Sequence, residues 1–209
     1  MLKSDRELKF QFPFWCSKLT EETTEVAEAI QISKGFAVRD SLAVEEFREK
    51  GYGEETKKDG LVLADYEALY LMYTLRLRVR RNKSTKRAES QNPKDLLFEH
   101  VVEEALHRDK SAWTKFLIYR DLRSRGYAPK EGFGFGADFR VYDRGEFGSK
   151  PAKFVVFGLN EGTEISIAAL SDAVKQISRM GKVPIAAVVE RRGEVIYYRV
   201  SKARFRELG

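Results

Sequence analysis

Residues 152–190, AKFVVFGLNEGTEISIAALSDAVKQISRMGKVPIAAVVE, contain two short apolar runs with a helical pattern between them. The runs at 154–157 and 183–189 are rich in Val, Phe and Ile, as strands commonly are. Residues 165–181 repeat apolar side chains at helical spacing. A strand, a helix and a second strand in this order predict a mixed α/β sheet. FGADFRVYD (135–143) and EVIYYRV (194–200) predict two further strands.

The first half of the chain predicts a second, smaller unit. Residues 19–30 are consistent with a capped helix or a polar turn, and residues 37–53 with a short strand and a glycine-stopped helix. Residues 61–79 predict a strand, a helix and a basic strand, and residues 93–125 predict two helices. We therefore expect an α+β fold. A small N-terminal α/β domain (1–90) precedes a C-terminal mixed-sheet, nuclease-like domain (91–209), with the boundary between 88 and 112.

Composition limits the possible functions. The 209 residues carry a net charge of +6 and a pI near 9.3, which suits a polyanionic partner. Cys16 is the single cysteine, which excludes a disulfide scaffold and a cysteine metal site, and its aromatic neighbours predict a buried thiol. No apolar run approaches 18 residues, so we expect a cytoplasmic protein with no membrane partner. The run PFWCSKL (13–19) either caps the N-terminal domain or contacts a partner.

Two groups of basic or titratable residues remain. His100 and His107 lie seven residues apart on one predicted helix without a third ligand nearby, so we expect no metal site and no cofactor. The stretch RLRVRRNKSTKR (76–87) alternates apolar and cationic side chains. Its cationic face is either a solvated strand face or a contact surface for phosphates or an acidic loop. The candidate RNA-binding residues are Arg76, Arg78, Arg80 and Arg81.

Two motifs in the second half resemble those of the archaeal tRNA-splicing endonuclease family. YRDLRSRGY (119–127) matches the family pattern YxDLRxRGY, and GADFRVY (136–142) matches its GxDFxVY strand. The segment DYEALYLMYTLRLRV (65–79) is also similar to the family's N-terminal domain. The resemblance covers about residues 50–203. It implies metal-independent cleavage of RNA that leaves a 2′,3′-cyclic phosphate and a 5′-hydroxyl.

The resemblance also implies which residues carry the chemistry. The family uses a tyrosine, a histidine and a lysine, and its tyrosine and lysine fall on Tyr142 and Lys182. The histidine position falls on Ala152, and a slip of one or two residues gives Lys150, Pro151 or Lys153 instead. Histidine exchanges a proton near neutral pH, whereas an ordinary lysine is a poor acid there. Tyr142 and Lys182 are therefore interpreted as remnants of the site.

The missing histidine leads to our functional hypothesis. The chain is expected to be a non-catalytic, structural subunit of a splicing endonuclease that removes introns from precursor tRNA at bulge-helix-bulge motifs. Two such chains would assemble with two catalytic subunits. The resemblance also places Lys175 at the position of the family's base-stacking arginine, which makes Lys175 a further candidate RNA-binding residue. The mixed charge of residues 190–194 weakens the family loop that docks into a neighbouring subunit. The alternatives are a homomeric endonuclease with Lys153 as an atypical acid, and a nuclease-fold RNA-binding protein outside splicing.

Overall fold

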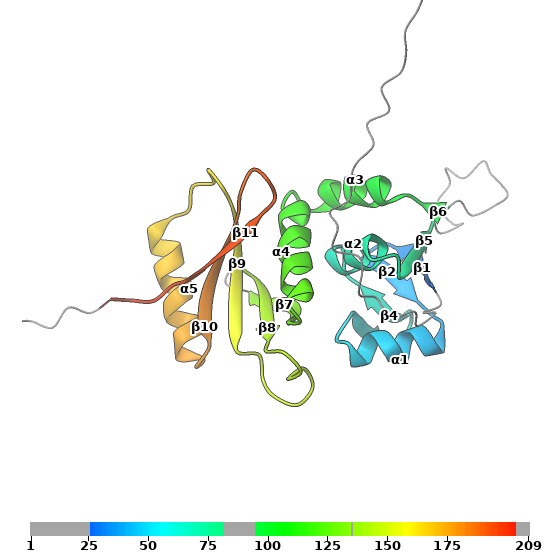
Figure 1. Ribbon diagram of the computed structural model, residues 1–209, viewed down its shortest axis with the longest axis horizontal. Helices are drawn as coiled ribbons and strands as arrows, with labels where there is room; N and C mark the ends of the chain where they lie inside the picture. The colour runs from blue at the N-terminus through cyan, green and yellow to red at the C-terminus, as the bar shows by residue number, and fades with distance from the viewer. Residues whose placement is uncertain (1–25, 82–94, 135, 204–209) are drawn as a thin grey trace, which may run out of the picture.

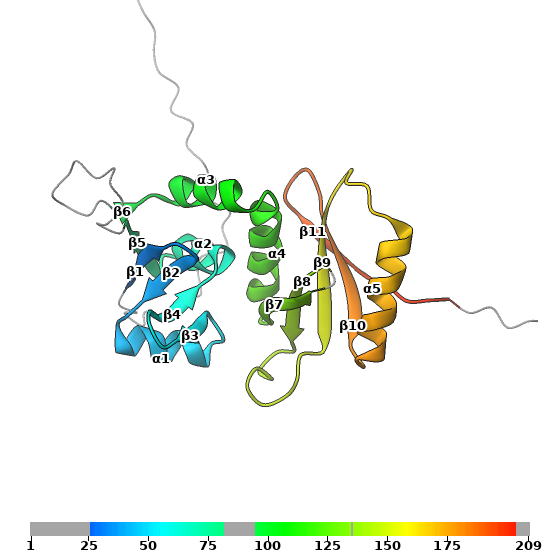
Figure 2. The same cartoon turned by 180° about the vertical axis from the view of Figure 1, so that it is seen from behind.

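The computed structural model describes residues 26–81, 95–134 and 136–203. In these ranges the chain forms two mixed sheets and five helices, which confirms the expected α+β class (Figure 1). Helix α4 (Ala112–Ser124) stands between the two sheets, and Figure 2 shows the same arrangement from behind. None of the helices in the described ranges has the length and apolar content needed to cross a membrane. Cys16 and the run 13–19 lie outside the described residues.

The N-terminal sheet has six strands in the order β3-β4-β2-β1-β5-β6. Only β1 and β5 pair in parallel. Helices α1 and α2 connect these strands, and α3 follows β6. The elements are β1 (Ala27–Ile32), β2 (Gly35–Val38), α1 (Ser41–Glu49), β3 (Glu54–Thr56), β4 (Gly60–Leu63), α2 (Asp65–Tyr73), β5 (Leu77–Arg80), β6 (Asp95–Leu96) and α3 (Phe98–Arg108).

Local sequence explains most of these elements, with one exception. Asp40 caps α1 by accepting a hydrogen bond from the backbone nitrogen of Ala43 at 2.9 Å. Residues 61–79 form the expected strand, helix and basic strand. The helical or turn interpretation of residues 19–30 is wrong from Ala27 onward, because β1 lies in the sheet between β2 and β5. Burial of Ala27 and Ala29 in the core outweighs the weak local preference of an Ala/Glu-rich segment.

The C-terminal sheet has five strands in the order β11-β10-β9-β8-β7. Its one parallel pair, β9 with β10, is connected by α5, as the opening stretch predicts. Helix α5 covers one face of this sheet and α4 lies on the other (Figure 1). The elements are β7 (Ala128–Gly134), β8 (Ala137–Tyr142), β9 (Phe154–Asn160), α5 (Ile167–Arg179), β10 (Val183–Val189) and β11 (Val195–Arg199). The pairing of β7 with β8 contains a register shift between Glu131 and Gly134.

Helix α4 joins the two halves through the side chain of Arg123. Its guanidinium donates to the carbonyl oxygens of Lys50 and Gly51 at 2.8 and 2.9 Å, just beyond the end of α1. It also donates to the Tyr119 hydroxyl at 3.0 Å and lies 4.0 Å from the ring centroid of Tyr52. A cation at a helix C-terminus is favourable because it faces unpaired carbonyl groups. The motif YRDLRSRGY therefore contains the contact that holds α1 against α4.

A buried ion pair provides a second connection between the two halves. Glu67 of α2 and Lys130 of β7 are 3.6 Å apart, and both side chains are almost fully buried. Lys130 Nζ donates to the carbonyl oxygen of Gly53 at 2.6 Å, and Glu67 accepts from the backbone nitrogens of Gly53 and Ala64 at 3.0 Å each. Each charge thus has more than one partner, which buried charges require. The pair fixes the position of β7 relative to α2.

We expect Arg123→Ala to lower the free energy of unfolding by about 2–4 kcal/mol, because two carbonyl oxygens and a hydroxyl lose a charged donor. Arg39→Ala is the matched control. It removes only an exposed ion pair with Asp59 at 3.9 Å, and such pairs contribute about 0–1 kcal/mol. Urea denaturation followed by circular dichroism measures both values. Equal losses in the two variants would contradict the role assigned to Arg123.

The turn between α3 and α4 makes stability depend on pH. Burial raises the pKa of Asp109, but hydrogen bonds from Lys115 and Ser111 outweigh it and hold the pKa at about 2, below the ordinary 3.8. A lowered folded-state pKa adds stability above the unfolded value, and this stability is lost as pH falls from about 4 to about 2. Asp109→Asn should therefore destabilise the protein at pH 7, and the difference from the parent should shrink below pH 4. A difference that stays constant between pH 7 and pH 3 would contradict this account.

Candidate active site at three strand ends

The backbone brings three segments together at one end of the C-terminal sheet. The backbone nitrogen of Lys153 donates to the carbonyl oxygen of Val141, and that of Val183 donates to the carbonyl oxygen of Lys153, both at 3.0 Å. Tyr142 ends β8, and Lys182 directly precedes β10. The residues around Ala152 precede β9, which lies between those two strands. The positions that the sequence analysis selected therefore lie on three neighbouring strands, at the same end of the sheet.

Lys182 is the best defined member of this group. Its Nζ donates to the carbonyl oxygen of Ala152 at 2.6 Å and lies 5.6 Å from the ring centroid of Phe133. A protonated amine in this place can offer its remaining hydrogens to an anion. One hydrogen, however, is used to fix the segment that precedes β9. Lys182 thus has a structural contact that does not depend on any catalytic role.

Tyr142 is held by a loop residue that the sequence analysis did not select. Its ring packs edge-to-face on Phe147, with centroids 5.1 Å apart. Phe147 in turn lies against Gly51, where an added Cβ would come within 2.9 Å of the Phe147 ring. Gly51 also has a positive φ of 73°, which favours glycine. No sequence pattern links residues 51 and 147, because the contact forms only when α1 and the β8–β9 loop meet.

The segment that precedes β9 contains an alanine, a proline and two lysines that form ion pairs. Ala152 is buried and Pro151 is exposed, and neither side chain titrates. Lys150 forms an ion pair with Glu146, and Lys153 forms one with Asp143 at 2.9 Å. The hydrogen bond to Asp143 raises the pKa of Lys153. A raised pKa does not favour Lys153 as an acid at neutral pH.

The candidate RNA-binding residues lie apart from the strand-end site. Lys175 is on α5 and pairs with Asp172 at 2.9 Å. The basic strand β5 belongs to the N-terminal sheet. Of the two arginines in β5 and the two that flank it, three form ion pairs. Within the described ranges Arg78 is exposed and has no ion pair. The observed pairs are Arg76 with Glu46, Arg80 with Glu28 and Asp95 at 2.8 and 3.4 Å, and Arg81 with Glu104 at 3.1 Å.

The two acidic residues of the family-like motifs hold the sheet together. Asp121 accepts a hydrogen bond from the Tyr197 hydroxyl at 2.8 Å and pairs with Arg125, which connects α4 to β11. Asp138 accepts from the backbone nitrogen of Gly158 at 2.6 Å. Burial raises the pKa of Asp138, and the hydrogen bond from Gly158 opposes this. Both carboxyl groups therefore have structural partners, and neither lies at the strand-end site.

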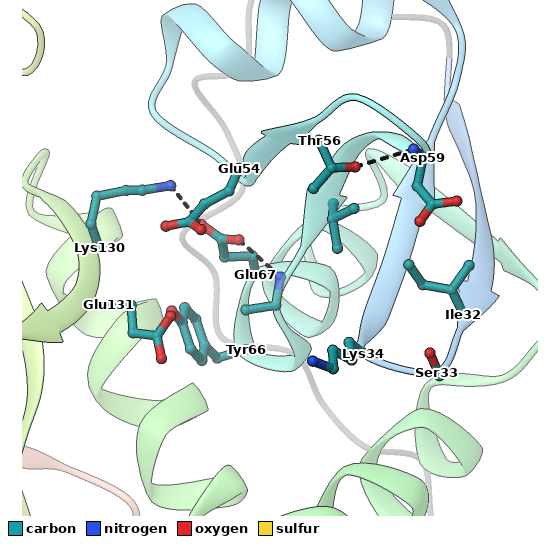
Figure 3. A pocket seen from close by; sticks show the side chains of 12 residues that line it. Ile32, Ser33, Lys34, Glu54, Thr56, Asp59, Tyr66, Glu67, Lys130 and Glu131 are labelled. Carbon is teal, nitrogen blue, oxygen red and sulfur yellow. Dashed lines mark hydrogen bonds and ion pairs between the residues drawn. The ribbon is translucent and has the colours of Figure 1, made fainter. Parts of the chain in front are cut away.

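A separate hollow of about 310 Å³ lies between the two halves, next to the Glu67–Lys130 pair (Figure 3). Glu54, Tyr66 and Glu131 also line it, and burial raises the pKa of Tyr66. None of its lining residues belongs to the strand-end site. Over the described parts of the chain, no three His, Cys, Asp or Glu side chains come together as a metal-binding group. His100 and His107 are exposed on α3.

Two sheets bridged by a helix, with candidate residues at adjacent strand ends, define an α+β protein of the nuclease-like class. Two family descriptions match the chain: the tRNA intron endonuclease N-terminal domain at residues 32–90, and the catalytic C-terminal domain at residues 112–197. The chain belongs to the tRNA intron endonuclease family.

Curated relatives agree with this assignment. The chain is 31% identical to a tRNA-splicing endonuclease of Methanococcus vannielii over 161 residues, which are 77% of this chain and 85% of the relative. It is 32% identical to one of Thermococcus gammatolerans, over 69% of this chain and 79% of that protein. A Methanosarcina mazei tRNA-splicing endonuclease is 33% identical over 77% of this chain, but the match spans only 42% of that longer protein.

Proposed function

We propose that this protein is a structural, non-catalytic subunit of an endonuclease that removes introns from precursor tRNA. Family membership supports the reaction, because the matched relatives are tRNA-splicing endonucleases. The observation that carries the subunit role is the strand-end site. By the family resemblance, Tyr142 and Lys182 occupy two of the three catalytic positions, and Ala152 or Pro151 occupies the position of the proton-exchanging histidine. The chain would supply scaffold and cationic surface, and a catalytic partner would supply the complete site.

The chemistry explains why one missing group matters. Attack of a ribose 2′-oxygen on the adjacent phosphorus forms the 2′,3′-cyclic phosphate and expels the 5′-oxygen of the next nucleotide. The leaving oxygen needs a proton, and general acid catalysis typically contributes about 10²–10⁴-fold to the rate. Lys153 has its proton stabilised by Asp143, so it donates poorly at neutral pH. Lys182 and Tyr142 can orient or stabilise a phosphate.

The assembly we propose contains two copies of this chain and two catalytic subunits. Strand β11 is at the edge of its sheet, and Ile196 and Tyr198 are 38% and 53% exposed. An edge strand with exposed apolar side chains can pair with a strand of another subunit. Residues 190–194 form the turn before β11, where Arg191 pairs with Glu161 of its own chain. We also propose that the boundary between the N-terminal and C-terminal domains lies between residues 88 and 112.

Substitutions at the remnant positions test the subunit role. In a complex reconstituted with the catalytic subunit, Tyr142→Phe and Lys182→Ala should leave the cleavage rate of a bulge-helix-bulge RNA within about twofold of the parent. Lys182→Ala should also lower the free energy of unfolding by about 1–3 kcal/mol, because the Ala152 carbonyl loses its charged donor. Single-turnover cleavage and thermal unfolding measure the two effects separately.

The outcome that contradicts the proposal is a large loss of cleavage with unchanged assembly. A 100-fold slower rate in Lys182→Ala, at concentrations where native mass spectrometry still shows the intact complex, would assign a catalytic role to this chain. The same loss in Lys153→Ala would favour the homomeric alternative with Lys153 as the acid. Lys150→Ala is the matched control, because it removes a neighbouring exposed ion pair of the same loop.

A further inference from the structure

An exposed aromatic patch lies at the first turns of α4, remote from the strand-end site. Its floor is the buried ring of Phe116. Tyr73 of α2 packs on Phe116 with centroids 6.2 Å apart, and Trp113 of α4 packs on it at 5.1 Å. Tyr73 is 51% exposed and Trp113 is 40% exposed. Tyr73 and Trp113 both pack on Phe116 and are both exposed to solvent. Exposed aromatic side chains grouped in this way indicate a binding surface.

The rim of this aromatic patch indicates what it binds. The Arg120 guanidinium lies 5.7 Å from the ring centroid of Tyr73 and 5.9 Å from that of Phe116. Within the described ranges Arg120 has no ion pair. A guanidinium close to aromatic rings can stack a further aromatic ring on its planar face. The aromatic patch is therefore suited to aromatic side chains rather than to aliphatic ones.

The chain itself carries such side chains close by. The described structure begins at Val26, which is 40% exposed, and the backbone nitrogen of Ala27 donates to the carbonyl oxygen of Arg76 at 3.1 Å. Arg76 is three residues beyond Tyr73, so the chain enters the fold beside the aromatic patch. Residues 10–15 lie outside the described residues, and their sequence is FQFPFW, with four aromatic residues in six.

Chain length permits the contact. Ten residues (16–25) separate Trp15 from Val26, and an extended chain spans about 3.3–3.6 Å per residue, so the reach is on the order of 35 Å. The patch itself is short, because the two steps from Tyr73 through Phe116 to Trp113 are 6.2 and 5.1 Å. One hydrogen bond and three residues connect Ala27 to Tyr73, so the reach exceeds the separation of Val26 from the patch.

We propose that the aromatic patch formed by Tyr73, Trp113, Phe116 and Arg120 is the docking site for residues 10–15 of the same chain. The rings of the segment cover the two exposed aromatic side chains and stack on the Arg120 guanidinium. Docking ties the start of the chain to α2 and α4, the two helices that connect the halves of the protein. The docking does not depend on RNA cleavage.

The test uses Trp113 as the reporter, because Trp15 and Trp113 are the only two tryptophans. Trp15→Phe makes Trp113 the sole tryptophan in an otherwise full chain. Acrylamide quenching then measures how accessible Trp113 is. Adding Phe10→Ser, Phe12→Ser and Phe14→Ser should raise the quenching constant at least about twofold and shift the emission to longer wavelength, because the ring loses its apolar cover. Lys9→Ser with Gln11→Ser is the matched control and should change neither value.

A second measurement reports proximity directly. Cys16 is the only cysteine, so a nitroxide attached there is placed next to the docking segment. It should quench Trp113 fluorescence in the Trp15→Phe chain, and the three Phe→Ser changes should remove that quenching. Equal accessibility of Trp113 with and without the three phenylalanines would overturn the proposal. Shielding that grows with protein concentration, or that develops only when RNA is added, would equally overturn it and assign the patch to a second copy or to RNA.

Discussion

The contact on which the rest of the structure depends is the Arg123 guanidinium at the end of α1. Arg123 projects from α4, which itself packs on the C-terminal sheet, and it binds carbonyl oxygens of the N-terminal half. The Glu67–Lys130 pair adds a second buried connection at the edge strand β7. Buried charged groups need several hydrogen-bond or ion-pair partners. A small shift between the two halves would break these contacts and lower the free energy of unfolding. The two sheets are thereby held in one relative position.

That position also determines the shape of the candidate site. The residue that follows Lys50 is Gly51, and the ring of Phe147 rests against it. Phe147 then packs on Tyr142, so the end of α1 influences a residue at the strand-end site. On the other side, Lys182 binds the carbonyl oxygen of Ala152. The strand-end site is therefore connected on one side to the end of α1 and on the other to the segment that precedes β9.

Sequence patterns predicted those features that depend on local periodicity or on short motifs. The helix at 167–179 and the strands beside it follow from residues close in the sequence. A family resemblance selected Tyr142, Ala152 and Lys182, and the strand order brings them to one end of the sheet. The contacts of Arg123, Phe147 and Arg76 did not follow, because each joins residues far apart in the chain. Strand β1 was mistaken for a helix or turn because its Ala/Glu composition gives little β signal, and burial between β2 and β5 decides its conformation.

The most direct test of the central claim is the cleavage activity of the isolated chain. A bulge-helix-bulge RNA is incubated with excess purified protein, in the presence and absence of the catalytic subunit, and single-turnover rates are compared at pH 6 to 9. The account predicts that the chain alone cleaves at least about 10²-fold more slowly than the mixture at every pH, because it lacks the proton donor. Cleavage by the chain alone at the rate of the mixture would contradict it.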